Sequence, residues 1–253
     1  MANLEQIKRL NEAYGKTSPL LEYSEKGYVS EAIDPKIIKK GFSNPIADLG
    51  PSYYGYFEAG LPASVALLFI DVSSFSTKMA NANGEEIAEY FDKYYDIIIP
   101  LIYKHGGEVD KVMGDGIICL FGPPFLENNI NDNIMNADQC AKDIIDDTLN
   151  TEFASKVALH SGEINYFQNK TGLYHEYTMI GKPVTELFRL ESISEDNSIN
   201  FYSDSTYGQN INLKGRMQQL AAIHVDWMIS DKKQIPAGIK GIDFQHYQTI
   251  SKR

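Results

Sequence analysis

The sequence predicts an α+β fold in which helices pack around a mixed β-sheet. Strand-like apolar runs alternate along the chain with segments whose apolar residues recur every three or four positions. A glycine-containing turn separates two of the strand-like runs, as in a β-hairpin. Apolar residues make up 43% of the 253 residues, so the chain can bury a substantial core. Together these observations favour helices layered on a sheet.

The elements can be justified in chain order from about residue 64. Residues 65–70 form a continuous apolar run that ends at Asp71, which predicts a buried strand over 65–71. Residues 85–103 carry apolar side chains at steps of three and four, which predicts an amphipathic helix. The β-rich runs 108–113 and 117–121 flank the turn Gly114-Asp115-Gly116 and predict a hairpin. The remaining elements are expected as a helix at 133–149, strands at 156–160 and 163–167, an extended piece at 176–180, a helix at 183–193, a strand at 199–202, a helix at 205–217 and β segments at 221–228 and 242–250.

Residues 1–60 differ from the rest of the chain. Prolines punctuate this stretch, and Tyr53, Tyr54 and Tyr56 cluster near its end. We therefore expect a leader with little regular structure after a first short helix. A single domain is expected over residues 61–253.

Composition narrows the class of protein. A formal net charge of −11 disfavours a general nucleic-acid or membrane-surface binder, because either would need a cationic surface. Cys119 and Cys140 lack the spacing of a disulfide framework or a zinc site, and His160 is expected to be structural. The longest apolar stretch is too short to span a bilayer, so we expect a cytoplasmic protein.

Two aspartates carry the clearest chemical signal. Asp71 and Asp115 each stand at the end of an apolar, strand-like run, where two carboxylates could converge on Mg²⁺ or Mn²⁺. A single aspartate in such a place more often starts a turn or caps a helix, but two in matched contexts favour a metal site. Ser74, Phe75 and Ser76 follow Asp71 closely and offer hydroxyls and backbone N–H groups to a phosphate.

Both aspartate segments closely resemble the catalytic domain of class III nucleotidyl cyclases. The resemblance implies a ferredoxin-like, mostly antiparallel fold. It also implies that Asp71, the adjacent Val72 and Asp115 bind two Mn²⁺ or Mg²⁺ ions, and that Lys111 contacts the base. The matching segments are Phe69-Ile70-Asp71-Val72-Ser73-Ser74-Phe75-Ser76 and Gly106-Gly107-Glu108-Val109-Asp110-Lys111-Val112-Met113-Gly114-Asp115-Gly116.

Two later segments, 156–162 and 177–191, resemble further signatures of that family. The resemblance places Lys156 where a phosphate-binding arginine is usual, and Arg189 where an arginine neutralises charge on the α-phosphate. A surface ion pair is the alternative for Arg189. Thr185 stands where the family usually carries asparagine. Lys240 is a weaker phosphate candidate in the late Ile239-Lys240-Gly241 segment.

The identity of the base is left open by Lys111 and Thr178. The resemblance implies that a lysine and a threonine at these positions are compatible with ATP. Lysine only donates and threonine donates or accepts, so the pair could equally serve the carbonyl groups of uracil. Thr185 weakens the case for a purine, and Tyr54 or a neighbouring tyrosine could fill the space that a smaller pyrimidine leaves. Packing of the leader on the domain is the alternative for these tyrosines.

A freestanding domain of this kind resembles the bacterial pyrimidine cyclases of antiphage signalling, so we expect UTP to be converted to cUMP. Adenylate cyclase activity and a non-catalytic nucleotide-binding module are the alternatives.

The spacing of Lys111 and Asp115 predicts a homodimer. The two residues lie on one hairpin, whereas the base and the phosphates are at opposite ends of a nucleotide. A head-to-tail pair resolves this: one copy contributes Asp71 and Asp115, and the other contributes Lys111, Thr178, Thr185 and Arg189 to the same interfacial site. The expected partners are a nucleoside triphosphate and a second copy of the chain.

Overall fold

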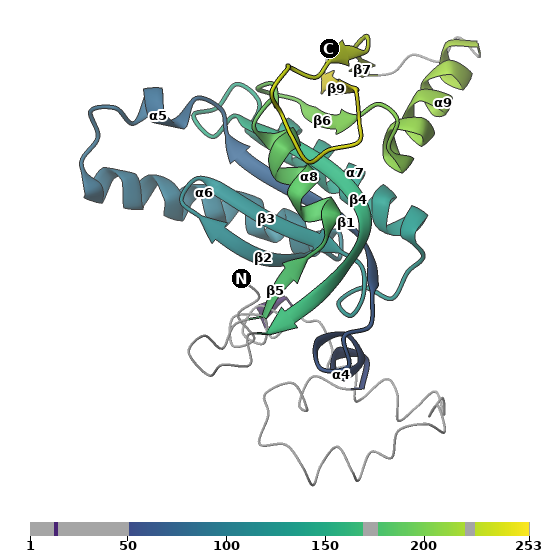
Figure 1. Cartoon of the computed structure of the whole chain (residues 1–253). Coiled ribbons are helices and arrows are strands. Elements are labelled where there is room, and N and C mark those ends of the chain that lie inside the picture. Colours follow the sequence, from purple (N-terminus) through teal and green to yellow (C-terminus); the bar gives the residue numbers. More distant parts are fainter. Residues whose placement is uncertain (1–12, 15–50, 169–176, 221–225, 253) are drawn as a thin grey trace, which may run out of the picture.

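The computed structural model describes residues 13–14, 51–168, 177–220 and 226–252 (Figure 1). Within these residues lies a nine-stranded sheet in the order β2-β3-β1-β4-β6-β9-β7, with β5 paired to β4 and β8 paired to β9. The pairing of β4 with β6 is parallel and the other described pairings are antiparallel. The predicted α+β fold with a mixed, mostly antiparallel sheet is therefore confirmed.

Most predicted elements are present within a few residues of their expected ends. The elements are α4 (Pro51–Phe57), β1 (Ala63–Val72), α5 (Phe75–Lys78), α6 (Gly84–Lys104), β2 (Glu108–Met113), β3 (Gly116–Phe121), α7 (Ile130–Thr148), β4 (Ser155–Gln168), β5 (Tyr177–Ile180), α8 (Lys182–Glu191), β6 (Ile199–Tyr202), α9 (Thr206–Leu220), β7 (Trp227–Ile229), β8 (Lys233–Gln234) and β9 (His246–Lys252).

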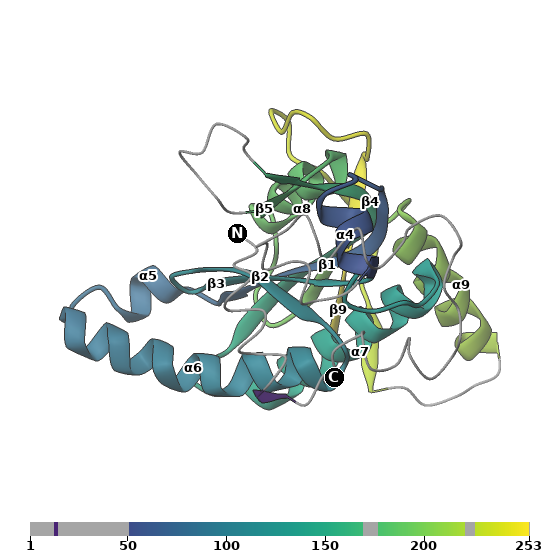
Figure 2. The same ribbon diagram turned by 90° about the horizontal axis from the view of Figure 1, so that it is seen from below.

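β1 is an interior strand of the sheet and is apolar on both faces. Leu68 and Ile70 point into a core shared with α6 and α7, whereas Leu67 and Phe69 belong to a second core that includes side chains of α4, β5 and α8. Figure 2 shows α6 and α7 on one side of the sheet and α8 and α4 on the other. Because both faces are covered, β1 lacks the alternation of apolar and polar residues that marks a half-exposed strand.

The first turn of α6 is well capped. The Asn83 side chain accepts hydrogen bonds from the backbone of Glu85 and Glu86, and the Glu86 carboxylate accepts one from the backbone N–H of Asn83. This reciprocal pair satisfies N–H groups that a helix leaves without partners. It fixes the start of the long helix that crosses one face of the sheet.

Two predictions about secondary structure were wrong. Residues 156–160 and 163–167 were expected as separate strands, but β4 runs unbroken through Ser161 and Gly162. Gly162 pairs with Val65 in β1, so the glycine continues the ladder instead of ending it. The leader was expected to be irregular after its first short helix, yet residues 51–57 form α4.

α4 forms because its aromatic side chains reach a core. Tyr53 and Phe57 are buried, and both rings pack against Phe125. The predicted helix at the start of the leader and most of the segment 221–228 lie outside the described residues. Among the described helices, none combines the length and apolar character needed to cross a membrane.

Candidate active site

Three neighbouring strands bring the predicted metal and phosphate residues together. β1 runs antiparallel to β3 on one side and to β4 on the other, so the end of β1 meets the beginnings of both neighbours. Asp71 is the penultimate residue of β1, and Asp115 lies in the turn just before β3. Lys156, near the start of β4, is the register partner of Asp71. Antiparallel pairing thus gathers two carboxylates and one ammonium group at one edge.

The two carboxylates are close enough to affect each other's ionisation. Partial burial and repulsion by Asp71 raise the pKa of Asp115 to about 6. A hydrogen bond between the two carboxyl groups adds to the rise, while the backbone of Asp115 and the charge of Lys156 oppose it. Two carboxylates that crowd in this way are suited to a divalent cation, whose charge would relieve the repulsion.

The oxygen donors fit a metal that is shared with a substrate. Within the described residues, no group of three or more His, Cys, Asp or Glu side chains is arranged to hold a metal ion alone. Asp71 and Asp115 therefore leave coordination positions for other oxygen ligands, such as phosphate oxygens. The valine side chain carries no oxygen, so only the backbone carbonyl of Val72 could contribute one.

Lys156 lies between two acidic side chains. Its Nζ is 3.1 Å from Asp71 Oδ2 and 2.9 Å from Glu191 Oε1. Burial alone would lower the pKa of Lys156, but the hydrogen bonds and charges of Glu191 and Asp71 raise it above its ordinary value. The ammonium group is therefore protonated at neutral pH. Glu191 was not predicted as a site residue.

The predicted phosphate cradle follows β1. Ser74 has a left-handed backbone (φ 59°) and donates a hydrogen bond to Asp196 Oδ2 at 3.2 Å. Phe75 and Ser76 lie in the short helix α5. The Phe75 ring stacks on Phe91 with centroids 5.2 Å apart, so this side chain serves packing. Ser74 and Ser76 are exposed and follow Asp71 closely along the chain.

Two tyrosines of α6 contact the backbone and side chains next to Asp115 and Lys156. Tyr95 donates a hydrogen bond of 2.5 Å to the carbonyl of Gly114, in the turn that carries Asp115. The Tyr94 hydroxyl lies 3.4 Å from Ser155 Oγ, next to Lys156. Sequence analysis missed Tyr95, although its position one turn after Phe91 signals a shared helix face.

α8 presents a second group of predicted residues. Thr185 and Arg189 are exposed and one turn apart, so they share a helix face that points away from the core. The helix is held by a buried contact of 3.0 Å between His160 Nε2 and Glu186 Oε2. The predicted structural role of His160 agrees with this contact, because the ring also packs edge-on against Tyr202.

The residues expected to contact the base lie on β2 and β5. Lys111 is half-buried on β2, just after a β-bulge. Thr178 is half-buried on β5 and pairs with the exposed Phe167 of β4. Tyr54 is half-buried on α4. Its neighbours Tyr53 and Phe57 pack into the core, which supports the packing alternative for Tyr53.

Lys240 lies on a long segment that is anchored to α8. An ion pair joins Lys182 of α8 to Asp243, and Gly241 lies beside the Thr185 methyl group. Figure 1 draws this segment as the yellow loop that crosses α8. Lys240 is exposed, close along the chain to Gly241 and therefore near the face of α8 that carries Thr185.

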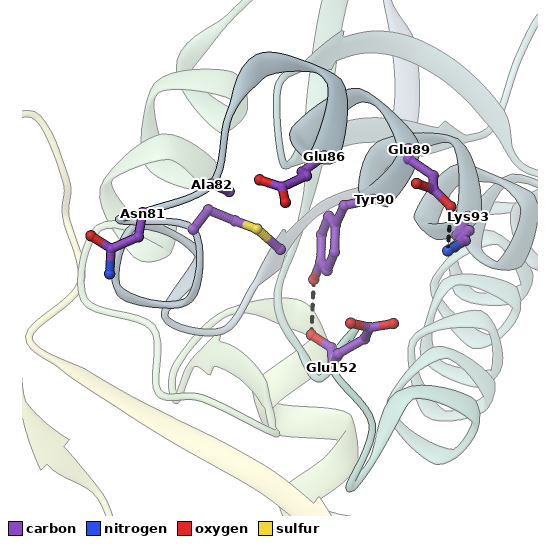
Figure 3. Close-up of a pocket in the computed structure, with 8 residues that line it drawn as sticks. Asn81, Ala82, Glu86, Glu89, Tyr90, Lys93 and Glu152 are labelled. Carbon is purple, nitrogen blue, oxygen red and sulfur yellow. Dashed lines mark hydrogen bonds and ion pairs between the residues drawn. The ribbon is translucent and has the colours of Figure 1, made fainter.

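A separate open pocket of about 400 Å³ lies beside the start of α6 (Figure 3). Three carboxylate side chains line it, and the hydroxyl of Tyr90 donates to the carbonyl of Glu152 at 2.8 Å. None of the predicted site residues lines this pocket, and its acidic lining disfavours a triphosphate. The lining residues are Met79, Asn81, Ala82, Glu86, Glu89, Tyr90, Lys93 and Glu152.

Comparisons with other sequences show distant similarity. No protein-family model matches the chain. The uncharacterized protein MT1361 of Mycobacterium tuberculosis (strain CDC 1551 / Oshkosh) is 21% identical over 175 residues, which are 63% of this chain and 31% of that protein. The chain thus spans about a third of the length of this curated relative.

Solved structures match more of the chain. The catalytic core of a rhodopsin-guanylyl cyclase with converted specificity, in complex with ATPαS, has 20% identity and a TM-score of 0.58. The match covers 78% of this chain and 100% of that one. The adenylyl cyclase CyaB from P. aeruginosa has 19% identity and a TM-score of 0.57, covering 76% and 96% of the two chains. The described chain therefore has the fold of the class III nucleotidyl cyclase catalytic domain.

Proposed function

We propose that the protein is a metal-dependent nucleotidyl cyclase that converts a nucleoside triphosphate to a 3′,5′-cyclic nucleotide and pyrophosphate. The observation that carries this proposal is the convergence of Asp71 and Asp115 at the edge where β1 meets β3, with Lys156 beside them. Two crowded carboxylates next to a lysine suit Mg²⁺ or Mn²⁺ together with a polyphosphate. The shared fold with adenylyl and guanylyl cyclase domains supports the same reaction.

A second copy of the chain would complete each site. Thr185 and Arg189 are exposed on α8, where a second copy could meet them. Within the described residues Arg189 has no ion pair, which favours a role in binding an anion over the surface ion pair considered above. Exposed apolar side chains on the elements that carry these predicted residues support self-association. They are Met113, Phe167, Ile180 and Phe188.

Residues of the chain would hold the metal ions and offset the charge that develops on the phosphates during the reaction. Asp71 and Asp115 would hold two metal ions, which when bound lower the pKa of the 3′-hydroxyl and offset phosphate charge. The 3′-oxygen attacks the α-phosphorus, the bond to the pyrophosphate oxygen breaks, and the hydroxyl proton passes to water. Lys156 of one copy and Arg189 of the other would offset the charge that develops. No protein nucleophile is required.

UTP is the substrate that we propose. Lys111 and Thr178 can donate to the carbonyl oxygens of uracil, and Thr185 lacks the amide that the family usually provides. Tyr54 is half-buried on α4 and is proposed to help fill the space beside a small base. ATP is the second candidate, because the Lys111 and Thr178 pair is also compatible with adenine. By resemblance to bacterial pyrimidine cyclases, we place the product in antiphage signalling.

One assay tests both the reaction and the base. The full chain is incubated with Mn²⁺ and each of the four nucleoside triphosphates separately, and the products are identified by mass. Formation of cUMP and pyrophosphate from UTP, lost in Asp71→Ala, is the expected result. Turnover of ATP alone would contradict UTP as the substrate and support adenylate cyclase activity. The absence of product from all four nucleotides would favour a non-catalytic nucleotide-binding module.

A further inference from the structure

Lys156 forms the centre of a shielded ionic triad. Its ammonium group contacts Asp71 on one side and Glu191 on the other, and the three side chains are only 18% to 20% exposed. Charges that are partly withdrawn from water interact more strongly than exposed ion pairs do. The negative charge of Glu191 therefore influences the interaction between Lys156 and Asp71.

The helix places Glu191 opposite the face that carries Arg189. Successive residues of an α-helix are rotated by about 100°, so Glu191 lies roughly 200° around the axis from Arg189. Arg189 is exposed, whereas Glu191 reaches back to Lys156 at the start of β4. One helix thus carries an outward-facing arginine and an inward-facing carboxylate that serves its own chain's metal edge.

The charge balance at this edge depends on Glu191. A divalent cation at Asp71 and Asp115 must compete with the positive charge of Lys156, which lies 3.1 Å from Asp71 Oδ2. Glu191 Oε1 contacts the same ammonium group at 2.9 Å, so the lysine's charge is shared between Glu191 and Asp71. Without the Glu191 charge, Lys156 would pair with Asp71 alone and oppose the cation more strongly.

The same end of α8 makes a second contact with the edge. Asp196, in the turn after the helix, accepts the hydrogen bond from Ser74. Glu195 fixes that turn through Lys233, with Nζ to oxygen distances of 2.6 and 2.7 Å. The turn that follows Glu191 is therefore anchored by two side-chain contacts, which help to hold the end of α8 in place.

We propose that Glu191 is a positioning residue of the metal site: by holding the Lys156 ammonium group, it leaves Asp71 available to a divalent cation. This inference rests on the proposed function, because it assumes that Asp71 and Asp115 bind metal. It assigns Glu191 no contact with the substrate. Its effect should be visible in metal affinity before any nucleotide is added.

The experiment is a titration of the full chain with Mn²⁺ alone, in which free Mn²⁺ is measured by electron paramagnetic resonance. Glu191→Gln should raise the Kd for Mn²⁺ about three- to tenfold, and Glu191→Asp, which keeps the charge, should restore most of the affinity. Lys156→Met should bind Mn²⁺ more tightly than the wild type. In that background Glu191→Gln should change the Kd by less than about twofold, because the lysine that it acts through is gone.

Matched controls separate this inference from the proposed function. Asp204→Asn removes the same charge from an exposed ion pair with Lys232 and should leave the Kd unchanged. An equal effect of Glu191→Gln with and without Lys156, or no effect at all, would overturn the positioning role while leaving the metal site intact. Wild-type protein that binds Mn²⁺ no better than Asp115→Asn would instead overturn the proposed metal site itself.

Discussion

The ring of Pro183 packs directly on the backbone of Gly162, so closely that a Cβ atom on residue 162 would lie 2.4 Å from Pro183 Cγ. Gly162 lies in the middle of β4, and Pro183 is in the first turn of α8. This contact sets how near the helix can approach the sheet. The helix in turn determines where Thr185, Arg189 and Glu191 lie.

Gly162→Ala should therefore displace α8. Overpacking of this kind costs about 1–3 kcal/mol, which corresponds to a fall in Tm of roughly 2–12 °C for a domain of this size. Calorimetry would measure the change, and cyclase activity should fall with it. Adding Pro183→Ala removes the ring carbon that clashes and should recover part of both losses. Gly84→Ala, where an added Cβ meets no atom within 4 Å, should not lower Tm.

Asp115→Asn should separate stability from activity. The variant removes a partly buried charge that Asp71 repels, so without metal the fold should gain about 1 kcal/mol after allowance for solvent screening. That gain corresponds to a rise in Tm of roughly 2–4 °C. Added Mn²⁺ should raise the Tm of the wild type but not of the variant. A variant that is both less stable and still stabilised by Mn²⁺ would contradict the assignment of Asp115.

Asp143 should make the fold sensitive to acid. Burial alone would raise the pKa of Asp143, but hydrogen bonds from Lys104, His105 and Gln139 lower it to about 2. Because the folded pKa is below the unfolded value, the stabilisation is complete above about pH 4 and is lost as the pH falls toward 2. Asp143→Asn should lower the free energy of unfolding by about 1 kcal/mol at pH 7, after allowance for the exposed part of the side chain. In urea titrations the difference should shrink between pH 4 and pH 3, and a difference that stays constant over this interval would count against the assignment.

The sequence predicted that Asp71 and Asp115 converge because its signals are local. An apolar run that ends at Asp71 and a Gly-Asp-Gly turn at Asp115 are each read from a few adjacent residues. The contacts of Lys156 with Glu191 and of Ser74 with Asp196 depend instead on how α8 and its following turn pack on the sheet. The spacing of apolar residues along the sequence cannot predict such contacts between distant segments.

Glycine and weak helix formers account for the errors in secondary structure. Ser161 and Gly162 were expected to separate two strands, yet the lack of a side chain at Gly162 is what allows Pro183 to pack against an unbroken β4. α4 contains Pro51 and Gly55 and has little intrinsic helix propensity. It is stabilised by the burial of Tyr53 and Phe57, which only the tertiary structure reveals.

The interfacial site can be tested by mixing two inactive variants. If each site combines Asp115 of one copy with Arg189 of the other, then Asp115→Asn and Arg189→Ala should each abolish activity alone. Random reassociation of equal amounts gives about half heterodimers, and each heterodimer has one intact site and one that carries both defects. The mixture should therefore recover about a quarter of wild-type activity per chain, measured as pyrophosphate release.

Mixing Asp115→Asn with Asp71→Ala is the control and should recover nothing, because both defects lie in the same half of the site. Failure of the first pair to complement, with heterodimers demonstrated by mass spectrometry, would place Arg189 and Asp115 in the site of a single chain.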